Sequence, residues 1–193
     1  MIETSKKFII GADECGYGSL AGEIVVCGVK ALKDWSFEGL NDSKKLSPKK
    51  RTSLTDSLSK NKDIQYHIAL RDNVYIDKIG VFSALKECYV EIFNALYCED
   101  SLIIIDGNMK FDNLSIDHME KISLIKADTL IPHVMAASII GKTNHDLKMT
   151  EVHHVNYPQY HFNSNMGYGS PKHKEAIKIH GLSDIHRKSY KIK

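Results

Sequence analysis

The sequence predicts a single α/β domain in which a mixed central sheet is covered by helices. Two features of the chain lead to this fold class. Strand-like apolar or alternating runs are interspersed with segments of helical spacing along the whole sequence. The 193 residues are enough for one sizeable core, and no repeat or Pro/Gly-rich linker divides them. We therefore expect one domain over residues 1–193.

The first half of the chain is predicted to hold three strands and one helix. The strands are expected at residues 7–13, 23–32 and 64–71. Ser47 is a capping residue followed by proline at the first helical position, which predicts a helix from Pro48 to about Asn61.

The second half is predicted to be mostly helical. Apolar residues recur at helical intervals over about 74–98. The short runs 101–106 and 121–128 are expected to be strands, and 131–149 a helix rich in small residues. Ser170 and Pro171 repeat the helix-start signal, and Gly181 ends that helix within a small helical C-terminal segment, about 151–193.

Composition excludes several classes of protein. No stretch approaches the roughly 18 apolar residues of a membrane span, and the N-terminus lacks the apolar region of a signal peptide. We therefore expect a cytoplasmic protein without a membrane partner. The four cysteines have no zinc-binding spacing, so free thiols in the core are expected.

Basic residues are concentrated in two segments. Residues 44–51 carry five basic side chains and no acid, and residues 171–193 have a net charge of +5. The chain total is +2, so the remainder has a net charge of −8. This distribution suits a protein that holds phosphates around a carboxylate centre, although solvated helix faces would give the same pattern.

Three apolar runs end in acids and indicate a metal site. They place Asp13 with Glu14, Asp106 and Asp128 at the expected carboxyl ends of strands, where open α/β sheets bind ligands. Clustered carboxylates repel one another unless cations lie between them, and oxygen ligands favour Mg²⁺ or Mn²⁺. Two such ions could activate a water for phosphodiester hydrolysis. The alternative is that these acids only end strands at the surface.

The residues around the first acids impose a condition and leave an alternative open. Neighbouring residues of a regular strand face opposite ways, so Asp13 and Glu14 can share a site only if the strand frays or bulges. The glycines Gly16, Gly18 and Gly22 follow. They are consistent with a loop that approaches a nucleotide closely or with a tight turn between strands.

At these residues the chain resembles ribonuclease HII, the type 2 ribonuclease H family. The motifs are GADECGYGSLAG from Gly11, DSKKL from Asp42, IDGN from Ile105, KAD from Lys126, AASII from Ala136 with Lys142, YP at Tyr157, GYG from Gly167 and IHR from Ile185. They run from about residue 9 to residue 190, which is nearly the whole chain. Only about seven residues precede the first strand, as expected for type 2 enzymes rather than type 3.

The resemblance implies a ribonuclease H-like fold and an endoribonuclease. Such an enzyme cuts the RNA strand of RNA–DNA hybrids, and cuts on the 5′ side of single ribonucleotides in duplex DNA. Two metal ions would assist water attack and leave 3′-hydroxyl and 5′-phosphate ends. The implied metal and catalytic ligands are Asp13, Glu14, Asp106 and Asp128, with Asp13 bridging the ions.

The resemblance also implies the substrate contacts. The loop Gly16, Tyr17 and Gly18 would read the 2′-hydroxyl, and Tyr168 would stack near the sugar. The implied phosphate contacts are Lys44, Lys45, Ser138 and Arg187. The family usually has arginine between the two glycines where this chain has Tyr17. Nuclease activity is therefore a firmer expectation than strict recognition of a lone ribonucleotide.

Two other functions and the state of assembly complete the expectations. The same fold could serve as a catalytically silent nucleic-acid-binding module, or as a nuclease directed at DNA. The retained acids disfavour a pure binder, because clustered negative charge repels phosphates. We expect a monomer, and no clear glutamine-led clamp-binding tail ends the sequence.

Overall fold

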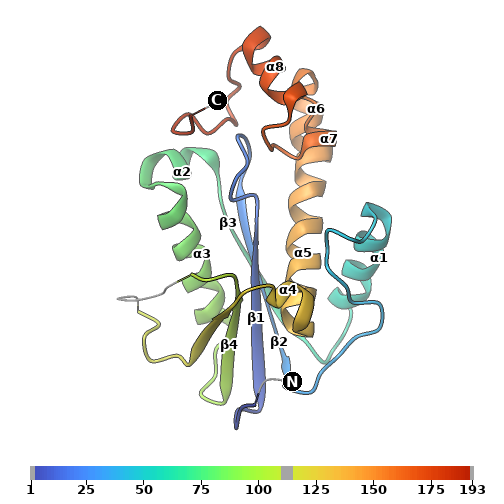
Figure 1. Ribbon diagram of the computed structural model, residues 1–193, viewed down its shortest axis with the longest axis vertical. Helices are drawn as coiled ribbons and strands as arrows, with labels where there is room; N and C mark the ends of the chain where they lie inside the picture. The colour runs from blue at the N-terminus through green and yellow to red at the C-terminus, as the bar shows by residue number, and fades with distance from the viewer. Residues whose placement is uncertain (1–2, 110–114, 192–193) are drawn as a thin grey trace.

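A five-stranded mixed sheet organises the computed structural model, which describes residues 3–109 and 115–191 (Figure 1). The strands are β1 (Phe8–Cys15), β2 (Ile24–Leu32), β3 (Gln65–Arg71), β4 (Ser101–Asp106) and β5 (Lys121–Leu124). Their order is β3-β2-β1-β4-β5. β1 is antiparallel to β2 and parallel to β4, β2 is antiparallel to β3, and β4 is parallel to β5. The predicted mixed central sheet is confirmed.

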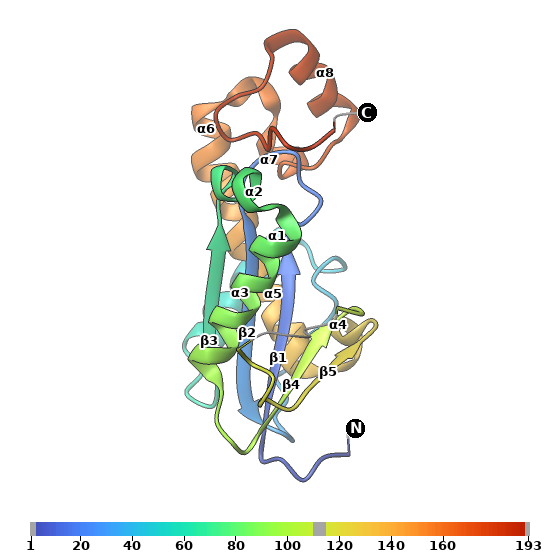
Figure 2. The same cartoon turned by 90° about the vertical axis from the view of Figure 1, so that its left-hand side faces the viewer.

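Two long helices cover opposite faces of this sheet, as Figures 1 and 2 show. α3 (Val81–Leu96) packs with Ile24 and Val26 of β2, whereas α5 (Pro132–Lys148) packs with Cys27 and Val29. This alternation follows from the two-residue period of a strand, which sends successive side chains to opposite faces. The sheet is therefore buried on both faces, and β4 is accordingly almost entirely apolar.

Glycines allow both helices to approach the sheet closely. A Cβ atom on Gly28 would lie 2.3 Å from Cγ2 of Ile92 in α3. On the other face, a Cβ atom on Gly11 would lie 2.4 Å from the backbone of His133 in α5. Because α5 crosses β1 at this short distance, its next turns come to lie beside the carboxyl end of β1.

The stretch 74–98, where helical spacing was predicted, is divided between two helices. α2 (Asn73–Ile79) ends at Gly80, and α3 begins directly after it. Gly80 has φ of +85° and ψ of 146°, a conformation open almost only to glycine, so the helix cannot continue through it. Apolar residues keep a helical spacing on both sides of Gly80, so the sequence pattern does not show where the first helix ends.

The predicted strand 121–128 is also shorter than expected. β5 ends at Leu124, Lys126 adopts a left-handed conformation with φ of +63°, and α4 (Ala127–Leu130) follows. Asp128 therefore lies in the first turn of a short helix and not at the end of a strand.

The C-terminal residues form the predicted small helical segment beyond one end of the sheet (Figure 1). The helix from Pro132 continues through a π-helical turn, Met149–His153, into α6 (His154–Asn156). A 3₁₀ turn (Pro158–Tyr160), α7 (Phe162–Asn165) and α8 (Pro171–His180) follow. α1 (Pro48–Ser59) lies earlier in the chain.

Both predicted helix caps are present. The Ser47 hydroxyl accepts a hydrogen bond from the N–H of Lys50, and that of Ser170 accepts one from His173.

The four cysteines are free, and Cys15, Cys27 and Cys88 are buried, as expected. Among the described residues, no helix combines the length and apolar character needed to cross a membrane.

Candidate active site

Asp13 and Glu14 lie at the carboxyl end of β1, where this strand extends past β4. The pairing of β1 with β2 continues without a bulge to Cys15, but its pairing with β4 ends at Ala12. Both acids line one hollow of about 480 Å³ at this edge of the sheet. The strand therefore separates from its neighbour on one side only, and this separation is enough for the two carboxylates to share the hollow.

The other two predicted acids come from the next strand and the helix after it. Asp106 is the last residue of β4 and lines the same hollow. The backbone N–H of Asp128 donates to Oδ1 of Asp106 over 3.3 Å, and the Asp128 side chain is buried. Nζ of Lys44 lies 3.4 Å from Oδ2 of Asp128. Three acids thus line the hollow directly, and Asp128 is joined to it through Asp106 and Lys44.

Burial makes these carboxylates costly to ionise in the absence of a cation. Burial raises the pKa of Asp13 to about 7, a hydrogen bond from Ser138 opposes this rise, and the charge of Asp106 adds to it. Burial likewise raises the pKa of Glu14 and of Asp106, with further increases from the charges of Asp106 and Asp128 respectively. Burial first and the neighbouring acids second therefore oppose ionisation of Asp13, Glu14 and Asp106 in the metal-free protein.

The glycine loop, defined here as residues 16–22, borders the hollow. Gly16 has φ of +84°, and a Cβ atom there would lie 2.7 Å from the carbonyl oxygen of Glu23. The N–H of Gly16 donates to Oη of Tyr168 over 3.1 Å. At Gly18, by contrast, no atom lies within 4 Å of an added Cβ atom. The loop is tightly packed at Gly16 and open towards solvent at Gly18.

The remaining predicted contacts lie at different distances from the hollow. Lys44 lines it with a side chain that is 74% exposed, and Tyr168 lines it with about a third of its surface exposed. Ser138 is buried at its edge, where its hydroxyl lies 2.8 Å from that of Ser43. Lys45 is exposed but does not line the hollow.

Arg187 corrects the prediction of a phosphate contact. Its side chain is 1% exposed, so it presents no surface to a duplex. Nε donates to the carbonyl oxygen of Gly22 over 3.1 Å, and Nη1 donates to that of Tyr17 over 2.9 Å. The structure therefore gives Arg187 the role of supporting the glycine loop from behind. The IHR motif placed this arginine near the site but contained no information about its burial.

Lys142 is a site residue that the sequence reasoning did not assign. It lines the hollow, its Nζ lies 2.7 Å from Oδ1 of Asp146, and it lies 5.8 Å from the centre of the Tyr168 ring. The spacing in the sequence could have indicated Lys142, because it lies four residues after the candidate Ser138 and residues four apart share one face of a helix.

A second group of potential metal ligands lies beside the hollow. One ligand atom each of Cys15, His145 and Asp146 lies within 4.8 Å of the others. The Asp146 carboxylate already accepts hydrogen bonds from Arg51 at 3.0 Å and from Lys142 at 2.7 Å. Burial raises the pKa of the Cys15 thiol to about 12. The Asp146 carboxylate is thus already paired with two cationic side chains, and burial opposes ionisation of the Cys15 thiol.

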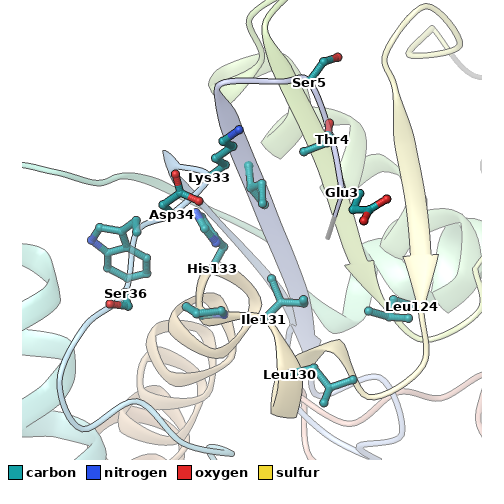
Figure 3. Close-up of a pocket in the computed structure, with 13 residues that line it drawn as sticks. Glu3, Thr4, Ser5, Lys33, Asp34, Ser36, Leu124, Leu130, Ile131 and His133 are labelled. Atoms are coloured by element: carbon teal, nitrogen blue, oxygen red, sulfur yellow. The ribbon is translucent and has the colours of Figure 1, made fainter. Parts of the chain in front are cut away.

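A hollow of larger volume lies elsewhere among the described residues. It has a volume of about 1110 Å³ and is lined by residues from the N-terminal segment, the segment after β2 and the start of α5, among them Lys33, Asp34, Ile131 and His133 (Figure 3). None of the four acids lines it. Volume alone therefore does not single out the hollow that Asp13, Glu14 and Asp106 line.

Comparisons with known proteins agree with the site. The family model described as Ribonuclease HII matches residues 10–193. The Ribonuclease HII of Aliarcobacter butzleri is 42% identical over 187 residues, which cover 97% of this chain and 92% of that protein. The Ribonuclease HII of Rickettsia typhi is 40% identical over 185 residues, with 95% and 91% covered.

Solved structures give the same fold. The structure of the PCNA:RNase HII complex from Archaeoglobus fulgidus aligns with a TM-score of 0.72 at 25% identity and covers 96% of both chains. Bst-RNase HIII in complex with Mn²⁺ aligns with a TM-score of 0.69, and 91% of this chain and 63% of that chain are covered. At 21% identity, the second likeness shows the fold alone.

The fold and the carboxylate-lined edge define a nuclease with ribonuclease H architecture. The chain belongs to the ribonuclease HII family. It is accordingly a metal-dependent endoribonuclease of the ribonuclease H class.

Proposed function

We propose that this enzyme hydrolyses the RNA strand of RNA–DNA hybrids and cuts on the 5′ side of single ribonucleotides embedded in duplex DNA. In each case water attacks phosphorus in line with the leaving oxygen, and the products are a 3′-hydroxyl and a 5′-phosphate. The observation that carries the proposal is the meeting of three acids and the open side of the glycine loop at one hollow.

The donor set fits divalent cations. Asp13, Glu14 and Asp106 present carboxylate oxygens to one hollow, and burial raises the pKa of each, so a bound cation would relieve an existing electrostatic cost. Hard ions such as Mg²⁺ and Mn²⁺ prefer oxygen ligands. These three acids and Asp128 would hold the two ions. When bound, the ions supply activation of the attacking water and stabilisation of the leaving oxygen.

The glycine loop and Tyr168 would supply selectivity for ribose. The open backbone at Gly18 lets a sugar approach the loop amides closely, and a 2′-hydroxyl can hydrogen-bond there whereas a deoxyribose cannot. The Tyr168 ring offers a partly exposed surface for packing against the neighbouring sugar. Because backbone groups read the hydroxyl in this scheme, Tyr17 in place of arginine leaves recognition of a lone ribonucleotide intact.

Basic side chains around the hollow would hold the phosphates. Lys44 and Lys142 line it, and Lys45 extends the exposed positive charge beside it. The buried Ser138 would act at short range, through a phosphate oxygen or through Asp13. Such contacts position the duplex without reading its sequence.

We further propose that the enzyme acts as a monomer in the cytoplasm.

The test is cleavage of three labelled duplexes: DNA with one ribonucleotide, an RNA–DNA hybrid, and DNA alone. Each is incubated with Mg²⁺, Mn²⁺ or EDTA. We expect cuts on the 5′ side of the lone ribonucleotide and within the hybrid, loss of both in EDTA, and no cutting of DNA alone. Cutting of the hybrid only would limit the proposal to RNA strands, and equal cutting of all three would replace it with a DNA-directed nuclease.

A further inference from the structure

Residues 185–190, called the C-terminal strap here, run alongside the glycine loop. The N–H of Gly22 donates to the carbonyl oxygen of Ile185 over 2.9 Å, and the N–H of Arg187 donates to that of Leu20 over 2.8 Å. Between these bonds, Ala21 and His186 form an isolated antiparallel bridge. A loop from the first tenth of the chain is thus paired with a segment more than 160 residues later.

Two side chains of the strap converge on one carbonyl group of the loop. Oη of Tyr190 donates to the carbonyl oxygen of Tyr17 over 2.7 Å, and Nη1 of Arg187 donates to the same oxygen over 2.9 Å. Nη1 of Arg187 also donates to Oη of Tyr190 over 3.0 Å. The Tyr190 hydroxyl therefore accepts from a cation while it donates to the carbonyl, an arrangement that strengthens the bond it donates.

This carbonyl matters because it shares a peptide plane with the N–H of Gly18. The peptide unit is flat and trans, so an oxygen held towards the strap turns the Gly18 N–H the opposite way. Gly18 has open space where a side chain would be, and a glycine restrains its own backbone least of all residues. The orientation of this amide therefore depends on what holds the Tyr17 oxygen.

The strap is itself anchored away from the site. The Asp77 carboxylate at the end of α2 accepts hydrogen bonds from the N–H of Lys188 at 2.9 Å, from the N–H of Ser189 at 2.9 Å and from Oγ of Ser189 at 2.6 Å. Three bonds to one carboxylate fix the residues directly before Tyr190. Tyr190 is therefore held in one position, and its hydroxyl can hold the Tyr17 carbonyl oxygen in place.

We propose that Tyr190 is a positioning residue for ribose selection: its hydroxyl fixes the Tyr17–Gly18 peptide so that the Gly18 amide meets the 2′-hydroxyl of the substrate. The inference rests on the proposed function, in which this loop reads the ribose. Tyr190 itself does not line the hollow of the acids and would act only through the loop.

The decisive variant is Tyr190→Phe, which removes one oxygen atom and keeps the ring. The matched control is Tyr160→Phe, because the Tyr160 hydroxyl also donates to a C-terminal carbonyl, that of Gly181 at 2.9 Å. Its ring packs near Ala21 and His186, and phenylalanine keeps that ring. Both variants lose one phenol-to-carbonyl hydrogen bond, and Tyr190→Phe also loses the bond accepted from Arg187. A loss of stability from the phenol-to-carbonyl bond would therefore appear in both variants.

Two measurements test the proposal. In steady-state cleavage of the single-ribonucleotide duplex, we expect Tyr190→Phe to lower kcat about three- to tenfold, as for loss of one hydrogen bond, while KM changes less than about twofold. In ¹⁵N–¹H spectra of the metal-free protein, we expect the Gly18 amide resonance to shift in Tyr190→Phe and to stay unchanged in Tyr160→Phe. An unshifted Gly18 resonance, or equal kcat losses in both variants, would overturn the role of Tyr190.

The two readouts keep this inference distinct from the proposed function. If the wild-type enzyme leaves the single-ribonucleotide duplex uncut, the proposed function fails, and the Gly18 resonance still shows whether Tyr190 orients the loop. A second variant, Asp77→Asn, weakens the anchor of the strap about 110 residues away in sequence. Asp77→Asn should shift the Gly18 amide resonance, as Tyr190→Phe does. If only amide resonances of α2 shift, the strap does not connect Asp77 to the glycine loop.

Discussion

At the scale of single residues, Asp13 combines burial with a position between other acids. Asp13→Asn keeps the shape of the side chain and removes its charge. We expect cleavage to fall at least about 100-fold, since even residues that only support a metal ligand cost 10- to 100-fold. The fold should persist, because the change removes repulsion in the metal-free protein. Circular dichroism with the cleavage assay checks both, and an unfolded variant would contradict this account.

The pH dependence of stability offers a second test of the same side chain. The folded pKa of Asp13, about 7, lies above its ordinary value of 3.8, so protonated Asp13 stabilises the metal-free fold at low pH. That contribution is complete below about pH 3.8 and is lost progressively as the pH rises from there to about 7. In EDTA, the Tm of Asp13→Asn should approach that of the wild type near pH 4 and exceed it increasingly up to pH 8. The exposed Asp56→Asn serves as control and should show no such divergence.

The residues of the site were not equally predictable from the sequence. Asp13, Glu14 and Asp106 follow apolar runs, and strand ends at one edge of a sheet must lie close together. Arg187 was misassigned because its charge is visible in the sequence whereas its 1% exposure depends on contacts with Tyr17 and Gly22. Local patterns thus identify which groups are present, but long-range packing decides what each one touches.

At the scale of elements, the breaks between helices and strands were the least predictable features. The α2–α3 junction depends on the backbone angles of Gly80 and the end of β5 on the left-handed Lys126, and neither changes the apolar spacing around it. The strands themselves and both serine caps were predictable, because a two-residue alternation and a capping hydroxyl are local properties.

Gly80 gives a prediction at this scale. A Cβ atom there would meet no other atom, so the cost of Gly80→Ala comes only from a φ of +85°. We expect the free energy of unfolding to fall by about 1–3 kcal/mol, with cleavage retained. Gly18→Ala should have the opposite pattern of effects. An added Cβ atom at Gly18 also meets no other atom, but Gly18 has no positive φ. This substitution should leave stability nearly unchanged and lower cleavage, and denaturant titrations of both variants would show whether this contrast exists.

At the scale of the whole molecule, buried neutral histidines join the C-terminal segment together. The N–H of Ser183 donates to Nδ1 of His186, whose Nε2 lies 3.0 Å from Nε2 of His173, and Nδ1 of His173 lies 2.9 Å from the carbonyl oxygen of Tyr168. When both rings are neutral, each of these three contacts has one donor and one acceptor. A proton added to Nδ1 of His186 would point at the N–H of Ser183, so two donors would meet there.

These histidines predict acid sensitivity. Burial lowers the pKa of His133 and of His186 to about 4, with the charge of His173 a further cause at His186. Since these values lie below the ordinary 6.5, the stabilisation is complete above pH 6.5 and is lost as the pH falls towards 4. In the Asp13→Asn background, which removes one of the acids that act in the opposite sense, the free energy of unfolding should drop by on the order of 2 kcal/mol per histidine between pH 7 and pH 5. Equal values at both pH conditions would contradict this.

The pairing of the glycine loop with the C-terminal strap also bears on how the enzyme is made. The ribosome synthesises Gly16 and Gly18 early, but Arg187 and Tyr190, which hold the Tyr17 carbonyl, emerge more than 160 residues later. A nascent chain can therefore present all four acids before its loop is held in place. The Tyr17 carbonyl would then be held only once residues 185–190 have been synthesised, after the strands that carry Asp13, Glu14 and Asp106.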